Sequence, residues 1–245
     1  MRTTVVRALA VVALVAVALG IGYAAARYTA LFALRELEVS GGSPAVDAAV
    51  REAGGAFLGE SLVALDREEV QQRIAALPSV RAVRLDRAFP HTLRVTVVPE
   101  RPLAVVRNGQ EAWLVSERGR VIRAAPEAAG ARPLVWTASE PDLRPGASVE
   151  SERVRLALRA LRALPPRFPE RILAARTDAA GITFVLADGT ELRLGTPDQL
   201  VLKLAVAARI LGEVTAAEQA ELAYLDVSVP ERAVGGSSLN SQLEG

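Results

Sequence analysis

The sequence contains no cysteine, and it contains only one histidine, His91, and one lysine, Lys203. The absence of cysteine excludes disulfides, thiolate nucleophiles and cysteine-ligated zinc, and it is compatible with both redox compartments. A Ser-His-Asp relay or a multi-histidine metal site would have to be built around His91. His91 follows Pro90 in an expected turn between strands, so we interpret it as a solvated loop residue. Lys203 lies in an expected helix, where we interpret it as a surface residue.

An excess of charge of one sign is also lacking. The chain has 29 Lys and Arg residues against 28 Asp and Glu residues, which gives a net charge of +1. Such a balance provides no field that would collect nucleic acid or acidic substrates. The sequence has neither a glycine-rich phosphate loop nor a Gly-x-Ser-x-Gly elbow, and no carboxylate pair has the spacing of a catalytic motif. We therefore predict no enzymatic activity, no catalytic residue, no cofactor, no metal, no nucleic-acid partner and no small-molecule substrate.

The N-terminus carries a long apolar run. No charged residue occurs from Ala8 to Ala26, and a helix of this length would reach about 28 Å, close to the thickness of a bilayer's hydrocarbon core. Arg2 and Arg7 precede the run, which favours a cytoplasmic N-terminus. We predict a short cytoplasmic segment over 1–7 and a transmembrane helix over 8–30, with its core at 8–26.

A cleavable signal peptide is an alternative interpretation of the same run. Gly20 and Gly22 interrupt it, and the small residues Ala24-Ala25-Ala26 are typical of a cleavage site. The sequence leaves the anchor and the signal peptide open. Both interpretations export the chain from residue 35 to residue 245.

The first exported segment, residues 34–101, is predicted to form a compact module. Ser43 before Pro44, and Asp66 three residues before Glu69, are typical of helix starts. Pro78 disfavours helical geometry at the preceding residue and ends the second helix. The predicted order is strand, helix, helix, strand, strand, with the strands near 37–39, 80–87 and 92–98 and the helices starting at 44 and 67.

This order is POTRA-like, and several phrases of the sequence resemble one family. The phrases are Leu77-Pro78-Ser79-Val80, Phe89-Pro90-His91-Thr92-Leu93, Glu100-Arg101-Pro102-Leu103-Ala104, Ala112-Trp113-Leu114-Val115 before Gly119-Arg120-Val121, Leu194-Gly195 before Lys203-Leu204, and Leu225-Asp226-Val227-Ser228-Val229-Pro230. Together with the single apolar run before them, they resemble the FtsQ/DivIB family of bacterial cell-division proteins over nearly the whole chain. The resemblance implies an extracytoplasmic POTRA domain followed by an FtsQ-type second domain.

Residues 102–234 are predicted to form this second domain, a mostly antiparallel β-sheet with helices on one side. One helix lies within 149–164, and another is capped by Thr196 and ends near Leu211. Residues 235–245 are small and polar and are predicted to be a disordered tail. The predicted fold class is therefore α+β, with a transmembrane helix, a POTRA-like β-α-α-β-β module and this sheet domain.

Two hairpins of the second domain can be assigned a register. A two-residue loop at Asn108-Gly109 predicts that Val105 pairs with Ala112. In the other hairpin, a three-residue loop over 187–189 keeps apolar residues on one face. The pairs predicted there are Phe184 with Leu192 and Ile182 with Leu194.

The residues expected to bind a partner lie near the end of the second domain. Leu225, Val227 and Val229 alternate with polar residues, so the strand should have a core face and a mixed face. A last strand is often an edge, where unpaired backbone groups allow strand addition; from the pattern alone, an ordinary closing strand fits equally well. In FtsQ/DivIB-like proteins this end of the domain docks a small coiled-coil partner. The resemblance thus implies a partner-binding site at Tyr224, Leu225, Asp226, Val227, Ser228, Val229, Glu231, Arg232, Ala233 and Val234.

The resemblance implies a non-enzymatic scaffold of the bacterial division machinery, which links early and late components and helps control septal peptidoglycan synthesis through protein contacts. The implied partners are small single-span coiled-coil proteins of the FtsB/DivIC and FtsL type and other membrane proteins of the divisome. The implied location is the cytoplasmic membrane at the septum, as a single-pass protein with a cytoplasmic N-terminus. The alternative is an exported POTRA-containing secretion or assembly factor with a cleaved signal peptide.

Overall fold

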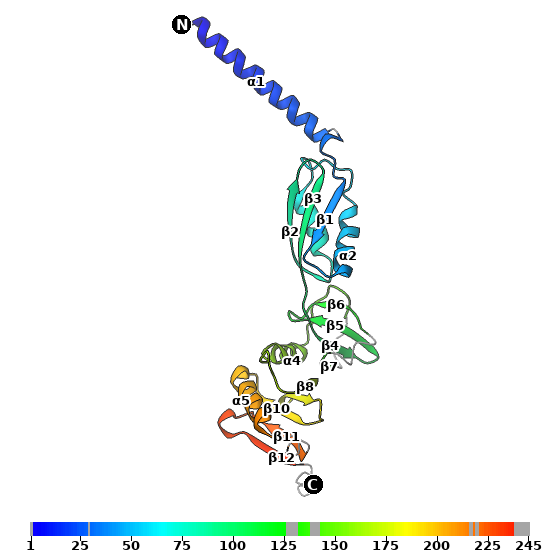
Figure 1. Ribbon diagram of the computed structural model, residues 1–245, viewed down its shortest axis with the longest axis vertical. Coiled ribbons are helices and arrows are strands. Elements are labelled where there is room, and N and C mark those ends of the chain that lie inside the picture. Colours follow the sequence, from blue (N-terminus) through cyan, green and yellow to red (C-terminus); the bar gives the residue numbers. More distant parts are fainter. Residues whose placement is uncertain are drawn as a thin grey trace. The chain divides into compact units, whose positions relative to one another are not determined.

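The computed structural model describes residues 2–28, 30–125, 132–137, 143–215, 218 and 221–237. Contacts divide the chain into two units, Met1–Pro99 and Glu100–Gly245. The first unit begins with helix α1, Arg2–Tyr28 (Figure 1). Among the described residues, no helix combines the length and the apolar character needed to cross a membrane. The transmembrane helix predicted over 8–30 is therefore not confirmed and stays a prediction.

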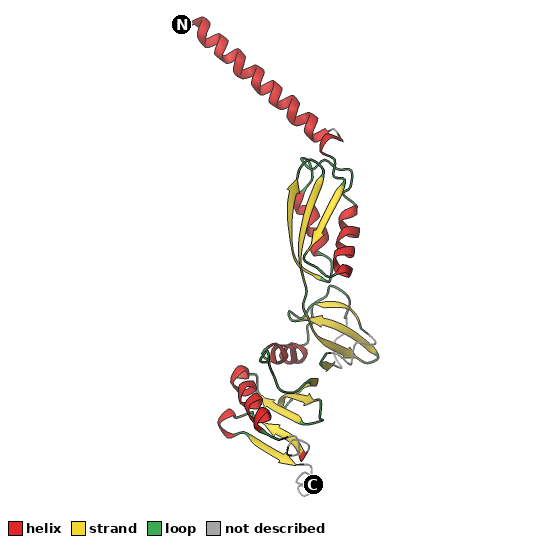
Figure 2. Cartoon of the chain, in the orientation of Figure 1, coloured by secondary structure: helices red, strands yellow, loops and turns green. Residues whose placement is uncertain are grey.

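A module of strands and helices follows α1 in the first unit. Its elements are η1 (Ala30–Phe32), β1 (Glu36–Ser40), α2 (Pro44–Gly55), α3 (Arg67–Ala75), β2 (Val80–Ala88) and β3 (Thr92–Pro99). The strand order is β1-β3-β2, with β1 parallel and β2 antiparallel to β3 (Figures 1 and 2). The predicted POTRA-like order of strand, helix, helix, strand, strand is confirmed.

Side-chain caps start both helices of the module where the sequence predicts them. The Ser43 hydroxyl accepts a hydrogen bond from the Val46 N–H, and Pro44 occupies the first helical position. The Asp66 carboxylate accepts bonds from the second and third N–H groups of α3. Each cap satisfies backbone donors that have no partner within the helix, and this contributes about 1 kcal/mol of stability.

The core of the module lies between the sheet and its helices. In β3 the buried residues Leu93, Val95 and Val97 alternate with exposed Arg94 and Thr96. Burial of each apolar side chain contributes about 1.5–3 kcal/mol. The other buried members of this core are Leu34, Val50, Phe57, Leu62, Leu65, Val70, Ile74, Val80 and Leu85. The alternation in β3 therefore decides which face of the sheet packs on the helices.

Within the described residues, the second unit contains a sheet of nine strands. They are β4 (Pro102–Asn108), β5 (Glu111–Ser116), β6 (Val121–Ala124), β7 (Leu134–Thr137), β8 (Ile172–Asp178), β9 (Gly181–Leu186), β10 (Glu191–Gly195), β11 (Leu222–Asp226) and β12 (Val234–Ser237). Their order is β12-β11-β10-β9-β8-β7-β4-β5-β6. Five of the eight neighbouring pairs are antiparallel and three are parallel, so the sheet is mixed but mostly antiparallel.

Helices α4 (Glu152–Arg162) and α5 (Leu200–Glu213) pack on the same side of this sheet. Leu158 of α4 and Leu204 of α5 belong to one buried cluster, together with Phe184 and Leu192 of the strands. Because successive residues of a strand point to opposite faces, the neighbours of these buried strand residues lie on the other, open face. The sheet is therefore covered by helices on one face. On the other face, β8 to β11 carry the row Arg176, Thr183, Arg193 and Asp226, whereas β4 and β5 carry a second, small buried cluster that includes Val105 and Leu114.

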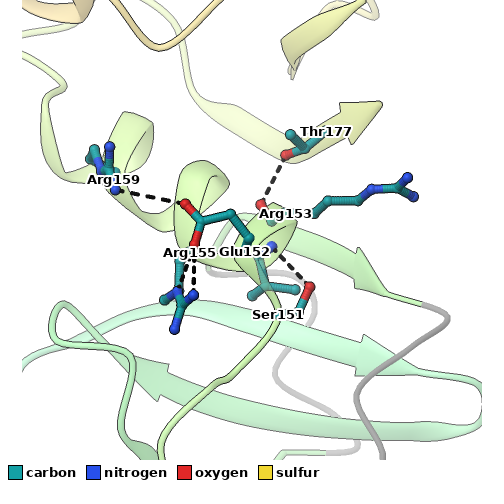
Figure 3. A network of polar contacts seen from close by, with 7 residues as sticks. Ser151, Glu152, Arg153, Arg155, Arg159 and Thr177 are labelled. Atoms are coloured by element: carbon teal, nitrogen blue, oxygen red, sulfur yellow. Dashed lines mark hydrogen bonds and ion pairs between the residues drawn. The ribbon is translucent and has the colours of Figure 1, made fainter. Parts of the chain in front are cut away.

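Polar contacts fix the start of α4 (Figure 3). The Ser151 hydroxyl accepts a bond of 3.4 Å from the Val154 N–H and caps the helix. The Thr177 hydroxyl, at the end of β8, donates a bond of 3.1 Å to the Arg153 carbonyl. This bond ties the first turn of α4 to the sheet, so the helix predicted within 149–164 begins at Glu152.

The β4–β5 hairpin has a different register from the predicted one. Val105 pairs with Leu114 and not with Ala112, because the two-residue loop is Gly109-Gln110 and Asn108 joins the ladder. Gly109 has a φ of +59° and occupies the first central position of the loop. Both favoured two-residue turns require a positive φ at that position, which glycine adopts without strain.

The β9–β10 hairpin follows the prediction at its loop. Gly189 has a φ of +93° and closes a three-residue loop, and Phe184 pairs with Leu192 as predicted. Ile182, however, pairs with Gly195 and not with the predicted Leu194. The reason is an irregularity in the ladder just before Gly195, where β10 carries an additional residue.

Lys203 and the start of α5 also differ from the prediction. The helix begins at Leu200 and Thr196 does not cap it; Gln199, with a φ of +52°, precedes it. The Lys203 Nζ donates to the carbonyls of Leu194 and Thr196 at 2.9 Å each, and the residue is 3% exposed rather than on the surface. A buried ammonium requires acceptors, so the carbonyls at the end of β10 fix Lys203 and thereby the position of α5.

Candidate functional site

The residues predicted to bind a partner form one strand, one turn and the start of another strand. Tyr224, Leu225 and Asp226 belong to β11, and the Val227 N–H continues the ladder by donating to the Arg193 carbonyl. The remaining predicted residues follow in order: Ser228 and Val229, then Glu231 and Arg232 in η3 (Pro230–Arg232), then Ala233 and Val234, the last being the first residue of β12. The fold brings all of them to the β11–β12 end of the sheet (Figure 1).

The exposed edge of the sheet at this end is β12. β11 pairs with β10 on one side and with β12 on the other, so the prediction that the strand from Tyr224 is an edge is wrong. The chain turns back at η3, which starts with Pro230, and residues 234–237 then pair antiparallel with β11. Residues 235–237 were assigned to a disordered tail but are part of this strand, whereas 238–245 lie outside the described residues. The backbone available for strand addition is that of β12.

Burial along β11 follows the predicted alternation as far as Val227. Leu225 and Val227 are 2% and 0% exposed and belong to the core. Val229, predicted on the same face, is 51% exposed. The alternation fails there because strand geometry ends at Asp226, and Val229 stands at the N-cap position of the turn η3.

A hollow of about 430 Å³ lies beside these residues. Its lining consists of Arg176, Asp178, Ala180, Thr183, Glu191, Arg193, Gly195, Asp226 and Ser228. A row across four neighbouring strands forms its floor, because Thr183 pairs with both Arg176 and Arg193, and Arg193 also pairs with Asp226. Directly paired residues share a face of the sheet, and this is the open face, away from α5. Asp226 and Ser228 are the predicted residues that line the hollow.

Exposed ion pairs join three charged side chains of the hollow, those of Arg176, Glu191 and Arg193, and its lining also contains the carboxylates of Asp178 and Asp226. Glu191 accepts bonds from Arg176 at 2.5 Å and from Arg193 at 3.2 Å. The Arg193 guanidinium also lies over the Tyr224 ring, 4.2 Å from its centre. The two arginine side chains are 51% and 45% exposed, and exposed pairs contribute only about 0–1 kcal/mol. These arginines can therefore exchange Glu191 for a carboxylate of a partner at small cost.

Two glycines in β12 let neighbouring side chains cover the edge strand. A β-carbon at Gly236 would lie 2.4 Å from the Tyr224 ring, and one at Gly235 would lie 2.9 Å from the Leu222 side chain. Gly236 pairs with Tyr224 in the ladder, so the ring extends across its own partner strand. An aromatic ring across an edge glycine compensates for the side chain that the glycine lacks.

Sequence reasoning missed the arginines of the hollow and the glycines of the edge. Arg176 and Arg193 lie in different strands, and only the order of β8 to β11 brings them together. Gly235-Gly236 had a local signal, because a pair of small residues that begins three residues after the turn Pro230–Arg232 fits a returning strand that must pass under a large ring. That signal was not used because residues 235–245 are small and polar, a composition typical of a disordered tail.

Among the titratable groups of the described residues, those that could hold a metal and the single histidine bear on reactive chemistry. Within the described part of the chain, no group of three or more His, Asp and Glu side chains is placed to hold a metal. His91, in the first unit, is half-buried and not solvated as predicted, because its Nδ1 lies 3.0 Å from the Ala33 carbonyl oxygen. At this end of the sheet, β12 presents edge backbone, and strands β8 to β11 present a hollow lined by charged side chains.

Comparison with known proteins covers both units. Residues 32–100 match the family described as "POTRA domain, FtsQ-type", and residues 104–228 match "Cell division protein FtsQ/DivIB, C-terminal". The second match ends before η3 and β12.

Several curated relatives carry the name "Cell division protein FtsQ". The protein of Mycolicibacterium smegmatis is 31% identical over 200 residues, which cover 80% of this chain and 57% of the relative. That of Mycobacterium tuberculosis is 29% identical over 204 residues, covering 83% of this chain and 62% of the relative. That of Streptomyces coelicolor is 28% identical over 180 residues, covering 69% and 67%. The chain thus spans less than two thirds of the length of the first two relatives, and it belongs to the FtsQ/DivIB family of bacterial cell-division proteins.

Proposed function

We propose that this FtsQ/DivIB-family chain is a non-enzymatic scaffold that links early and late components of the division machinery and helps control septal peptidoglycan synthesis through protein contacts. Family membership and the division role in the names of its relatives support the general part of this proposal. The observation that carries the specific part is the exposed edge strand β12, near a hollow whose lining contains two arginines and three carboxylates.

The proposed mechanism is addition of a partner strand to β12. An edge strand has backbone N–H and C=O groups without partners on its outer side, and these provide affinity for an extended segment. The proposed partners are the small single-span coiled-coil division proteins of the FtsB/DivIC and FtsL type, and other membrane proteins of the divisome. The proposed binding surface comprises residues 224–234, which include the end of β11 and the turn η3, and it extends along β12 to Ser237.

The open face beside β12 provides selectivity in this proposal. Val234 pairs with Asp226, and Asp226 pairs with Arg193, so all three share the face that carries the hollow. A strand added outside β12 would lie three strand spacings, about 14 Å, from β10. The acidic side chain would therefore come from a partner segment that continues from the added strand over the open face, where it would meet Arg193 and Arg176 after Glu191 is displaced. Arginine forks bind carboxylates with two parallel bonds, which makes the contact directional.

The proposed location is the cytoplasmic membrane at the division septum. The uncharged run from Ala8 to Ala26 supports a single-pass anchor with residues 1–7 in the cytoplasm, and α1, at 27 residues, is about 40 Å long. In this topology a POTRA domain over 34–101 and a second domain over 102–234 lie outside the cytoplasm. Mass spectrometry of the membrane-bound protein tests it, because cleavage after Ala26 would instead indicate the exported secretion or assembly factor.

Disulfide scanning tests strand addition. The chain has no cysteine of its own, so Val234→Cys, at a position 54% exposed, can be oxidised against single cysteines moved along the partner's extracytoplasmic segment. Cross-links at every second partner position are expected, since the side chains of a strand alternate. Leu173→Cys, 38% exposed on β8 and four strands away, serves as the control. Equal cross-linking from both positions, or a repeat of three to four residues, would reject strand addition.

A further inference from the structure

Three exposed apolar side chains gather at one end of the first module. Leu31, Leu58 and Phe89 are 62%, 50% and 55% exposed. We call this group the module tip. Large apolar side chains exposed singly are ordinary, but a group of them at one end of a domain marks a surface that leaves water when it binds.

Hydrogen bonds show that the three segments of the module tip are held together. Leu31 lies in η1, and the residues that follow it bond to both of the other segments. On one side the Gly59 N–H donates to the Leu34 carbonyl, and the Leu34 N–H donates to the Glu60 carbonyl. On the other side the Arg35 N–H donates to the His91 carbonyl. The chain over 32–35 therefore runs between the turn that contains Leu58 and the turn that contains Phe89.

An aromatic contact joins the same segments. The rings of Phe32 and Phe89 meet edge to face, with their centres 5.6 Å apart. Phe89 thus rests on η1 while more than half of its surface stays exposed. The module tip is therefore formed by segments that hydrogen bonds and an aromatic contact hold together, and not by unconnected loops.

The module tip lies at the end of the module where the chain comes from α1. At this end β1 begins and β2 gives way to β3, since Thr92 pairs with both Glu36 and Ala88. Helix α1 ends at Tyr28, and η1 begins at Ala30. Consecutive Cα atoms are about 3.8 Å apart, so Ala30 lies within about 8 Å of the end of the helix.

We propose that the module tip inserts into the lipid interface, so that the POTRA-like module rests on the membrane surface through Leu31, Leu58 and Phe89. The inference rests on the proposed function only through the membrane anchor. If the run ending at Ala26 spans the bilayer, the short covalent distance holds the tip in the headgroup zone. Apolar side chains in that zone leave water for acyl chains, and aromatic rings are favoured there.

Charge does not drive this contact. The exposed charged residues next to the tip have both signs, with Arg35 beside Glu36 and with Glu60 two residues after Leu58. Binding through such a surface depends on apolar insertion and is insensitive to salt, whereas a basic surface would release anionic vesicles at high ionic strength. Salt dependence therefore separates this proposal from electrostatic adsorption.

Single fluorescent labels on the full-length chain test the proposal. Cysteine is introduced at Leu58 or at Phe89 and labelled with an environment-sensitive nitrobenzoxadiazole probe, and the chain is reconstituted into phosphatidylcholine–phosphatidylglycerol vesicles. Val98→Cys is the matched control, because Val98 is an exposed apolar residue (49%) on the same module. It lies six residues along β3 from Thr92, about 20 Å from the tip end.

Both tip probes are expected to be quenched at least about twofold by lipids that carry a nitroxide on the acyl chain, at low and at high salt, while the probe at 98 is not. If the protein floats with the vesicles but the tip probes are quenched no more than the probe at 98, the module tip does not insert and the inference is overturned. The membrane anchor is then unaffected. If the protein does not float with the vesicles, both the membrane anchor and the insertion of the module tip are overturned. Because Phe89 contacts Phe32, Leu58→Cys provides a second reading from a position outside that aromatic pair.

Discussion

The Tyr224 ring lies directly across Gly236, its partner in the neighbouring strand, so closely that a β-carbon on Gly236 would fall 2.4 Å from the ring. The shape of the sheet edge thus depends on the absence of one methyl group. In the proposed complex, this edge is the surface that the partner strand meets.

Gly236→Ala is expected to destabilise the second domain by about 1–3 kcal/mol, because the new methyl group must displace the ring or the strand. Urea unfolding measures the loss. Gly212→Ala is the control, since nothing lies within 4 Å of a β-carbon there and the position is helical; it should be neutral or stabilise by up to about 1 kcal/mol. Tyr224→Ala should remove most of the penalty of Gly236→Ala. Additive effects in this double-mutant cycle would show that the two residues are not coupled.

Lys203→Met is expected to cost about 1–3 kcal/mol. Methionine has a similar length, but it leaves the Leu194 and Thr196 carbonyls without the two bonds of 2.9 Å. Arg209→Met is the control, because it removes a cation from the same helix. Arg209 pairs with Glu213, both side chains are exposed, and the variant should cost less than about 1 kcal/mol. Equal unfolding free energies for the two variants would contradict a structural role of the buried ammonium.

Charge changes at the hollow should alter partner binding in opposite directions. Arg193→Glu is expected to weaken capture of the coiled-coil partner roughly 5- to 50-fold, while Glu191→Gln, which frees the arginines, should strengthen it. Binding measured by fluorescence anisotropy at two salt concentrations checks both signs. Arg209→Glu, on the exposed side of α5, controls for net charge. Unchanged affinity in the Arg193 and Glu191 variants would exclude the hollow from the interface.

Glu218 should titrate below the usual range of a glutamate. The Thr215 N–H donates to its carboxylate at 3.0 Å and the Thr215 hydroxyl at 2.8 Å, and these bonds lower the pKa of Glu218. Because the folded pKa lies below the unfolded value of about 4.3, the stabilising contribution is present above that pH and is lost as the pH falls through the folded pKa.

Carbon-detected NMR titration of Glu218 measures this effect directly. Thr215→Ala removes the hydroxyl bond and should raise the pKa of Glu218 part of the way towards its ordinary value. Thr215→Ser keeps a hydroxyl and should leave the pKa nearly unchanged. Identical titration curves for the alanine and serine variants would show that the hydroxyl does not contribute.

Local signals predicted the first module well because its elements are set by neighbouring residues. Ser43 and Asp66 cap helices through groups two or three residues away, and Leu93, Val95 and Val97 alternate within one strand. The three-residue loop ending at Gly189 was predictable for the same reason, since only one register keeps apolar pairs on one face.

The rest could not be predicted because it depends on contacts between distant segments. The β4–β5 register depends on which of two neighbouring loop positions Gly109 occupies, and both keep apolar residues paired. The burial of Lys203 depends on where β10 ends, and the burial of β11 depends on residues 234–237 folding back onto it. At the candidate site, the sequence pattern indicated a strand from Tyr224, but the topology determined which strand forms the edge of the sheet.

The parallel pairing of β1 with β3 gives the first module a particular response to force. The chain enters this pair at Glu36 and leaves it at Pro99, and Glu36 lies opposite Thr92 while Ser40 lies opposite Thr96. Since the strands run in the same direction, pulling the two ends of the module apart slides β1 along β3. The hydrogen bonds between them then bear the load simultaneously and must break together, instead of opening one after another from an end. A chain held by a membrane on one side and by a partner on the other would thus carry tension in shear.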